Sequence, residues 1–165
     1  MTEQLDSDVR AGYSHSQTGV LTLTLLAIPA VICLMLGLSG LWQTYPLAGL
    51  FFVVMVLFHS LTVKLDEVAI HLSYGIGLVR RSIPLERVAV CAPVRNRWFY
   101  GLGIRYVGTG WMWNNAGLDA VELTYTDGRQ FRIGTDEPRE LVEAITQAMA
   151  SSETGVRRGY LGQTD

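Results

Sequence analysis

The chain has 165 residues, of which 49% are hydrophobic and only 17% are charged, and its formal net charge at pH 7 is −2. Soluble globular domains contain about 25% charged residues, so this composition excludes an ordinary water-soluble domain. A slightly acidic chain without a run of Lys or Arg is also not expected to bind nucleic acid.

The chain begins with a polar segment, residues 1–18, which we expect to be a cytoplasmic tail. The apolar residues 19–42 follow and could form a helix of roughly 36 Å, longer than the hydrocarbon core of a bilayer at about 30 Å. A second apolar segment, residues 45–63, has Thr44 as a candidate helix cap. Because only two residues separate the segments, the sequence predicts a two-helix transmembrane hairpin over residues 19–63.

The basic residues near this hairpin indicate its orientation in the membrane. The turn between the two segments has no Lys or Arg, whereas Arg10 precedes the hairpin and Lys64, Arg80, Arg81 and Arg87 follow it. The first segment is also too long for the apolar part of a signal peptide, which has about 7–15 residues. By the positive-inside rule, we expect a multi-pass protein of the cytoplasmic membrane with both termini in the cytoplasm.

Residues 64–150 predict a cytoplasmic domain that is α+β and mainly β. Short stretches in which apolar and polar residues alternate are separated by turn residues, which indicates six or seven short strands. Asp66 and Glu67 are the expected turn between the first two. The strands are expected in "LTVKLD", "VAIHLSY", "GIGLVRRSIPL", "RVAVCAPV", the aromatic stretch of residues 98–113, "DAVELTY" and "RQFRIG".

The last two of these strands predict a hairpin with a three-residue loop, Thr126-Asp127-Gly128. A two-residue loop would place apolar and polar residues on the same face, whereas the longer loop sets Leu123 opposite Phe131. A helix is expected next, capped by Thr135 or Asp136, with an apolar stripe formed by Leu141, Val142, Ile145 and Met149. The polar residues 151–165 are expected to be disordered.

The order of these parts resembles the pleckstrin-homology-like (PH-like) domains of small bacterial membrane proteins. The resemblance covers about residues 61–150 and rests on "SIPLERV", "RYVGTGWMW" and above all "AVELTYTDGRQFRIGTDEP". It implies a barrel of two antiparallel sheets capped by one C-terminal helix, and binding or scaffolding rather than catalysis. Eukaryotic relatives hold phosphoinositide headgroups in a basic loop between their first two strands. The corresponding turn here carries Asp66 and Glu67, so that activity is not carried over.

Basic and aromatic residues gather between residues 80 and 105. Residues 64–105 contain seven basic and three acidic residues, whereas residues 106–153 contain three basic and eight acidic ones. Aromatic rings beside Arg suit a membrane interface or a peptide groove, although aromatic residues also fill the cores of strands. The candidate lipid- or partner-binding residues are Arg80, Arg81, Arg87, Arg95, Arg97, Trp98, Phe99, Tyr100 and Arg105.

Motifs for catalysis, metal binding or nucleotide binding are missing from the sequence. Gly101, Gly103, Gly108 and Gly110 do not fit the dinucleotide pattern G-x-G-x-x-G, because Tyr106 occupies the position of its third glycine. No HExxH or CxxC motif occurs, and the three His are scattered. We therefore expect no catalytic residue, no metal and no cofactor.

These observations favour a membrane-anchored, non-enzymatic module at the cytoplasmic face, which engages either a protein partner or anionic lipid headgroups. The alternative is an accessory subunit of a larger membrane complex. In that case the hairpin would pack against other helices through Gly37, Gly40 and Gly49, which allow close approach.

Overall fold

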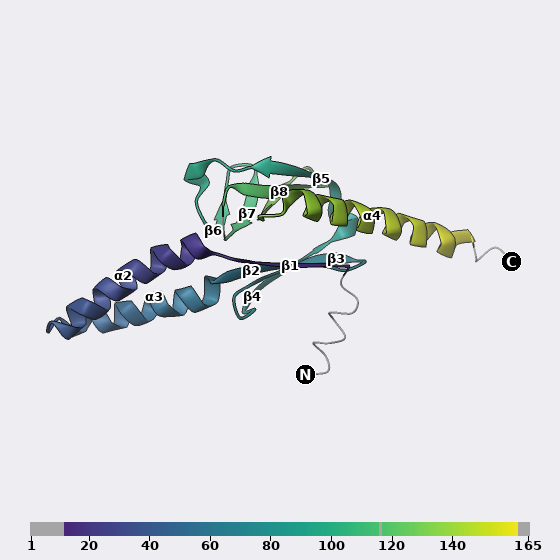
Figure 1. Cartoon of the computed structure of the whole chain (residues 1–165). Coiled ribbons are helices and arrows are strands. Elements are labelled where there is room, and N and C mark those ends of the chain that lie inside the picture. The colour runs from purple at the N-terminus through teal and green to yellow at the C-terminus, as the bar shows by residue number, and fades with distance from the viewer. Residues whose placement is uncertain (1–11, 116, 162–165) are drawn as a thin grey trace, which may run out of the picture.

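The computed structural model describes residues 12–115 and 117–161, with side chains described as far as residue 152. Figure 1 shows a body of two β-sheets, from which two helices project at one end and a long C-terminal helix projects at the other. The chain is therefore an α+β protein. Its helices are α2 (Val20–Leu38), α3 (Tyr45–Phe58) and α4 (Pro138–Leu161), and its 3-10 turns are η1 (Trp42–Thr44), η2 (Leu85–Arg87) and η3 (Trp98–Tyr100).

The strands form a four-stranded and a five-stranded sheet. The first is antiparallel with the order β1-β2-β3-β4, and the second has the order β5-β8-β9-β7-β6, in which only β7 and β9 are parallel. The first sheet consists of β1 (Tyr13–Thr18), β2 (Ser60–Leu65), β3 (Ala69–Tyr74) and β4 (Val79–Pro84). The second consists of β5 (Val88–Arg95), β6 (Gly103–Tyr106), β7 (Gly110–Asn114), β8 (Asp119–Tyr125) and β9 (Gln130–Gly134).

The two sheets do not close into the barrel that the family resemblance implied. Strands β1 and β4 are the edges of the first sheet, β5 and β6 are the edges of the second, and no strand pairing joins the sheets in the described part of the chain. The β6–β7 hairpin extends the second sheet through a parallel pairing with β9, which continues that sheet rather than joining it to the first. The two sheets therefore keep free edges.

Strand β1 lies within the segment that the sequence predicted as a polar tail. It pairs with β2 from Tyr13 opposite Leu65 to Thr18 opposite Ser60, so α2 and α3 are inserted between two paired strands. Alternation of apolar and polar residues did not predict β1, because it is an edge strand whose side chains are mostly polar and largely exposed or half-buried. Only its Gln17 is buried, where the side-chain amide donates to the carbonyl of Gly134.

Helix α2 is long and apolar enough to cross a membrane by its length and composition. Helix α3 ends at Phe58, although the sequence predicted a helix to residue 63, because residues 60–65 pair with strands on both sides as β2. The second apolar segment is therefore a shorter helix followed by a strand. Thr44 does not cap α3 through its side chain but donates to the carbonyl of Cys33 at 2.7 Å, which ties the two helices together.

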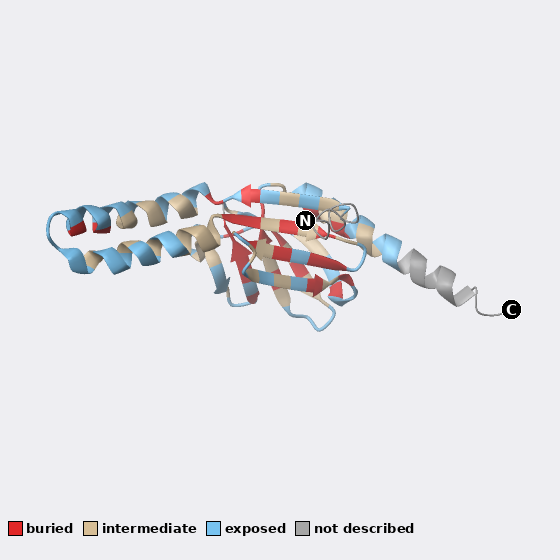
Figure 2. Ribbon diagram, turned by 90° about the horizontal axis from the view of Figure 1, so that it is seen from below, coloured by how far each residue is buried: buried red, intermediate tan, exposed pale blue. Residues whose placement is uncertain are grey.

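The core lies between the inner faces of the two sheets and under α4. Figure 2 shows that buried residues concentrate in the strands, whereas exposed and half-buried residues dominate α2 and α3. The hydrophobic effect thus holds the body together, while the two projecting helices leave apolar surface uncovered. The largest fully buried side chains are Tyr74, Phe131, Leu61, Ile70, Leu72, Met112, Leu123, Ile133, Leu141, Ile145, Val63 and Val121.

The predicted loop Thr126-Asp127-Gly128 is confirmed. Leu123 lies opposite Phe131, and Gly128 has a positive φ of 82°. Helix α4 starts at Pro138, and the Thr135 hydroxyl accepts a hydrogen bond from the Glu137 N–H at 3.1 Å, as expected of a residue at a helix start. The helix continues to Leu161, although disorder was predicted from residue 151, and residues 162–165 lie outside the described part.

The predicted turn between β2 and β3 depends on the carboxylate of Asp66, which accepts hydrogen bonds from the N–H groups of Val68 (2.9 Å) and Ala69 (2.7 Å). Partial burial opposes ionisation of Asp66, but these bonds and the neighbouring His71 lower the pKa of its carboxyl below the ordinary value of 3.8. A carboxyl with a lowered pKa stabilises the fold above its unfolded pKa, and this contribution is lost as pH falls through the folded pKa.

We therefore expect Asp66→Asn to destabilise the protein by about 1 kcal/mol at pH 7, because the turn loses a charged acceptor. The difference from the native chain should shrink as the pH falls through the lowered pKa of the native carboxyl, because protonation removes the charge that Asn also lacks. Thermal unfolding at pH 7 and at pH 2 measures both effects. Glu67→Gln in the same turn is the control and should change the unfolding midpoint little at either pH. A constant effect of Asp66→Asn at both values would contradict this account.

Candidate binding surfaces

The structure divides the predicted binding residues between two surfaces. The first, here called the aromatic edge, consists of Arg95 at the end of β5, Arg97 just before η3, the η3 residues Trp98, Phe99 and Tyr100, and Arg105 in β6. Arg81 and Arg87 belong to a separate cavity, here called the arginine pocket. Arg80 lies on the opposite face of β4 from Arg81, because successive residues of a strand point to opposite sides, and it donates to the carbonyl of Gly77.

The aromatic edge presents rings to solvent. Trp98 is 81% exposed and Phe99 is 55% exposed. Their rings pack edge to face with centroids 5.9 Å apart, and Phe99 packs in the same way on Tyr100 at 5.2 Å. The Arg97 guanidinium lies 5.8 Å from the centre of the Phe99 ring. This surface therefore combines amphipathic rings and positive charge, the combination that is enriched at membrane interfaces.

Two buried asparagines connect the aromatic edge to the base of the projecting helices. The Asn114 amide at the end of β7 donates to the carbonyl of Gly101, directly after η3, at 3.3 Å. The next residue, Asn115, accepts at its backbone carbonyl from the Thr22 hydroxyl of α2 at 2.9 Å. Figure 1 accordingly shows β6, the strand after this loop, beside the start of α2. The aromatic edge thus lies at the end of the body from which α2 and α3 project.

The side chain of Asn115 also joins both helices. In the amide orientation that suits its neighbours, its nitrogen donates to the Phe58 carbonyl at 2.9 Å and its oxygen accepts from the Gly19 N–H at 3.1 Å. Asn115 is buried, so these bonds are shielded from water. The end of the second sheet is therefore hydrogen-bonded to the start of α2 and to the end of α3.

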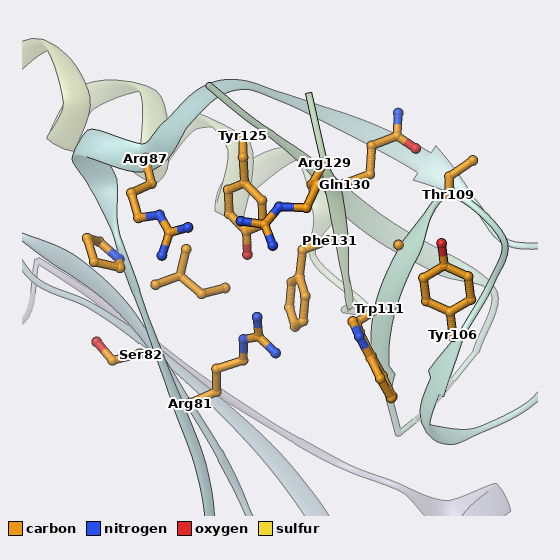
Figure 3. Close-up of a pocket in the computed structure, with 13 residues that line it drawn as sticks. Arg81, Ser82, Arg87, Tyr106, Thr109, Trp111, Tyr125, Arg129, Gln130 and Phe131 are labelled. Atoms are coloured by element: carbon orange, nitrogen blue, oxygen red, sulfur yellow. The ribbon is translucent and has the colours of Figure 1, made fainter. Parts of the chain in front are cut away.

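The arginine pocket is a cavity of about 300 Å³ between the first sheet and the second. Figure 3 shows that Arg81 from β4, Arg87 from η2 and Arg129 from the loop before β9 point toward the hydroxyl of Tyr125. Arg81 stacks 4.6 Å from the centre of the buried Phe131 ring. The residues that line the cavity are Arg81, Ser82, Ile83, Pro84, Arg87, Tyr106, Thr109, Gly110, Trp111, Tyr125, Arg129, Gln130 and Phe131.

Positive charge exceeds negative charge in this pocket. Arg129 pairs with Asp127 through two hydrogen bonds to one carboxylate oxygen, at 2.6 and 2.8 Å, and these bonds hold the pKa of Asp127 below its ordinary value. Arg81 and Arg87 form no ion pair with an acid among the described residues. Burial raises the pKa of the Tyr125 hydroxyl, and the neighbouring Arg81 and Arg87 oppose that shift. Tyr125 is therefore protonated at neutral pH and can donate a hydrogen bond.

Sequence reasoning proposed Arg81 and Arg87 as candidate binding residues but did not include their neighbours in the pocket, Trp111, Tyr125 and Arg129. These come from three different strands and loops, and no local pattern signals that they meet. The sequence left open whether the aromatic residues of 98–113 fill the core or lie at the surface. The structure shows both, because Trp113 is buried in the core while Trp98 and Phe99 are exposed. The described residues contain no group of three or more His, Cys, Asp or Glu that could hold a metal ion.

No protein-family profile, no curated protein and no solved structure matches this chain.

Proposed function

We propose that the chain is a membrane-anchored PH-like module that binds rather than catalyses, held at the cytoplasmic face by α2 and α3. The observation that carries the proposal is the aromatic edge, whose exposed Trp98 and Phe99 lie beside Arg97. The loop after these rings is joined to α2 through Asn114, which donates to the Gly101 carbonyl, and through Asn115, which accepts from the Thr22 hydroxyl. Two sheets followed by a C-terminal helix support the PH-like assignment.

The exposed surface of the helices supports insertion into a bilayer. Leu25, Leu38 and Phe52 are all more than half exposed, and the region between Arg10 and Lys64 has no charged residue. Such a surface is unfavourable in water and favourable in hydrocarbon.

The lengths of the two apolar helical segments, α2 and η1 with α3, support insertion as a hairpin. Helix α2 has 19 residues, or about 29 Å, and η1 with α3 adds up to roughly 27 Å, close to the thickness of a hydrocarbon core at about 30 Å. In this arrangement Trp42 and Tyr45 at the tip would lie at the far interface, where such rings are enriched.

In the same arrangement the aromatic edge would face the headgroups of the near leaflet. Trp98 and Phe99 would insert among the headgroups, and Arg95, Arg97 and Arg105 would each contribute about 1 kcal/mol of attraction to an anionic leaflet. The positive-inside rule then favours the cytoplasmic side for the body and for both termini. The partner protein or lipid would meet the body directly above the membrane surface.

Gly49 on α3 favours a second candidate function, that of an accessory subunit in a membrane complex. A Cβ atom at Gly37 would meet the Tyr45 ring and Gly40 forms the turn, so both serve the helix pair itself. Gly49 has no atom within 4 Å of the position that its Cβ would take. It leaves room on α3 for the close approach of a helix from another protein.

Depth measurements in lipid vesicles test the proposed function on the full chain. Each of three variants carries a single Cys that is labelled with an environment-sensitive fluorophore, in a background with Cys33→Ala and Cys91→Ala. The three variants are Phe52→Cys, Val68→Cys and Trp98→Cys. We expect lipids with a spin label deep in the acyl chain to quench position 52, and lipids with a headgroup label to quench position 98. Position 68 is the matched control, because Val68 is 70% exposed in the β2–β3 turn, away from the helices, and neither lipid should quench it.

The three positions separate the parts of the proposal. A label at position 52 that no lipid quenches would show that the helices do not insert. A label at position 98 that behaves like the one at position 68 would show that the aromatic edge does not reach the membrane. Either outcome would contradict the proposed function.

A further inference from the structure

The arginine pocket has the composition of a site for a small anion. Three guanidinium groups converge on it, although like charges placed close together repel, and among the acids that the structure describes only Asp127 forms an ion pair with one of them, Arg129. Arg81 and Arg87 are instead held by aromatic rings, at 4.6 Å from the centre of Phe131 and 5.8 Å from the centre of Tyr125. Arg81 also forms a side-chain hydrogen bond with the Tyr125 hydroxyl. Because a guanidinium carries five N–H groups, these contacts orient the two Arg side chains and still leave donors for a ligand.

The donors in the pocket match the geometry of a phosphate group. Arg presents its N–H groups in a planar fork that bonds to phosphate oxygens in pairs, and hydrogen bonds between charged groups are stronger than neutral ones. The protonated hydroxyl of Tyr125 adds a donor between the Arg side chains. The cavity of about 300 Å³ has room for more than a phosphate ion, and Trp111 and Phe131 supply an apolar part of its wall.

We propose that the arginine pocket binds a small soluble phosphate monoester, whose phosphate group bridges Arg81 and Arg87 and whose organic part lies toward Trp111. This site is distinct from the aromatic edge, and the proposal does not depend on the membrane role described above.

The position of the pocket favours a soluble ligand over a lipid headgroup. Asn114, at the end of β7, lies next to the base of α2, whereas the pocket is lined by Gly110 at the start of the same strand. Four residue steps along a strand span about 13 Å. The first sheet also places the pocket away from the helices. Gly75, before β4, lies against the end of α3, whereas Arg81 lies farther along the chain in β4 and Arg87 lies beyond that strand in η2. The phosphate groups of lipids and of soluble monoesters have the same chemistry, so the experiment must distinguish which of the two binds.

Calorimetric titration of the full chain, held in nanodiscs of phosphatidylcholine, tests this site. The probes are phenyl phosphate, which has a flat organic part, and inorganic phosphate. We expect both to bind, phenyl phosphate more tightly, and we expect Arg81→Gln and Arg87→Gln each to weaken phenyl phosphate by about tenfold or more. Arg80→Gln is the matched control, since Arg80 is adjacent on β4 but points to the other face, and it should bind as the native chain does.

Three outcomes would overturn the proposal. One is that neither probe binds the native chain, and another is that Arg81→Gln and Arg87→Gln both bind phenyl phosphate with native affinity. Thermal unfolding of each variant shows whether its fold is intact, and Arg87→Lys, which keeps the charge without the fork, should still weaken binding in a folded protein. The third outcome is that replacing phosphatidylcholine with phosphatidylglycerol in the nanodiscs displaces phenyl phosphate, which would identify the lipid as the source of the anion.

Discussion

Replacement of residues 20–58 by the dipeptide Asn-Gly is expected to yield a water-soluble domain that keeps both sheets. Strands β1 and β2 are paired up to Thr18 and Ser60, and the Gly19 N–H donates to the His59 carbonyl at 2.9 Å. The ends of the excised segment are therefore already at the distance that a two-residue hairpin turn closes, and Asn-Gly favours such a turn. The helices contribute little to the core, whose buried side chains belong almost entirely to the strands, η2 and α4.

The effect on solubility should be large, because the excised segment carries most of the exposed apolar side chains of the chain. We expect a monomer in buffer without detergent, with cooperative thermal unfolding by near-ultraviolet circular dichroism. The control is a chain that begins at Ser60 and so also lacks β1, which leaves the edge of β2 uncovered and removes Tyr13 from the core. It should be less stable and should aggregate more readily. An unfolded or insoluble Asn-Gly form would show that the helices belong to the folding unit.

The substitution Gly110→Ala is expected to destabilise the body by about 3 kcal/mol, because a methyl group here has no space. Its Cβ atom would overlap the backbone carbonyl of Gln130, the residue paired with Gly110 in the parallel ladder between β7 and β9. A backbone atom held in a sheet cannot move aside as a flexible side chain can. Relief would require separation of the two strands at the start of β7.

The matched control is Gly108→Ala, two residues earlier. Gly108 has a positive φ of 84° but no atom within 4 Å of its Cβ position, so alanine there meets backbone strain alone, about 1 kcal/mol. Urea unfolding of both variants, in the soluble domain, gives the two free energies of unfolding. Equal costs would mean that β7 and β9 do not pair closely at this point. Because Gly110 and Gln130 also line the arginine pocket, Gly110→Ala should weaken phosphate binding as well.

Local patterns predicted most of the strands but not how they pair over long distances. Alternation located β3, β4, β5, β8 and β9, and it located β2 in part, because residues 61–63 are also predicted as part of the second apolar helix. The position of Gly128 sets the register of the last hairpin. The same reasoning failed where tertiary contacts decide the structure. The apolar run through Phe58 to Val63 reads as continuous helix, yet β2 begins at Ser60, because strand pairing on both sides outweighs local preference.

Long-range contacts account for the rest of what the sequence did not predict. Strand β1 has almost no apolar side chain, so only its pairing with β2 identifies it. The parallel pairing of β7 with β9 joins segments that a β-strand separates, and nothing in either segment indicates the other. The arginine pocket follows from that pairing, since Trp111 and Phe131 meet as neighbours across it and then face Arg81 from the other sheet.

The insertion of both helices between paired strands gives the body two points of attachment to the helix pair. A domain on a single flexible linker swivels and samples every direction above a membrane. Here one helix leaves the sheet at Gly19 and the other returns at His59, with no linker at either place, and Asn115 is bonded to both helices. In a bilayer, swivel about one strand would require the other to break away from the sheet. A ligand or partner would therefore meet this protein at a fixed height and in one orientation.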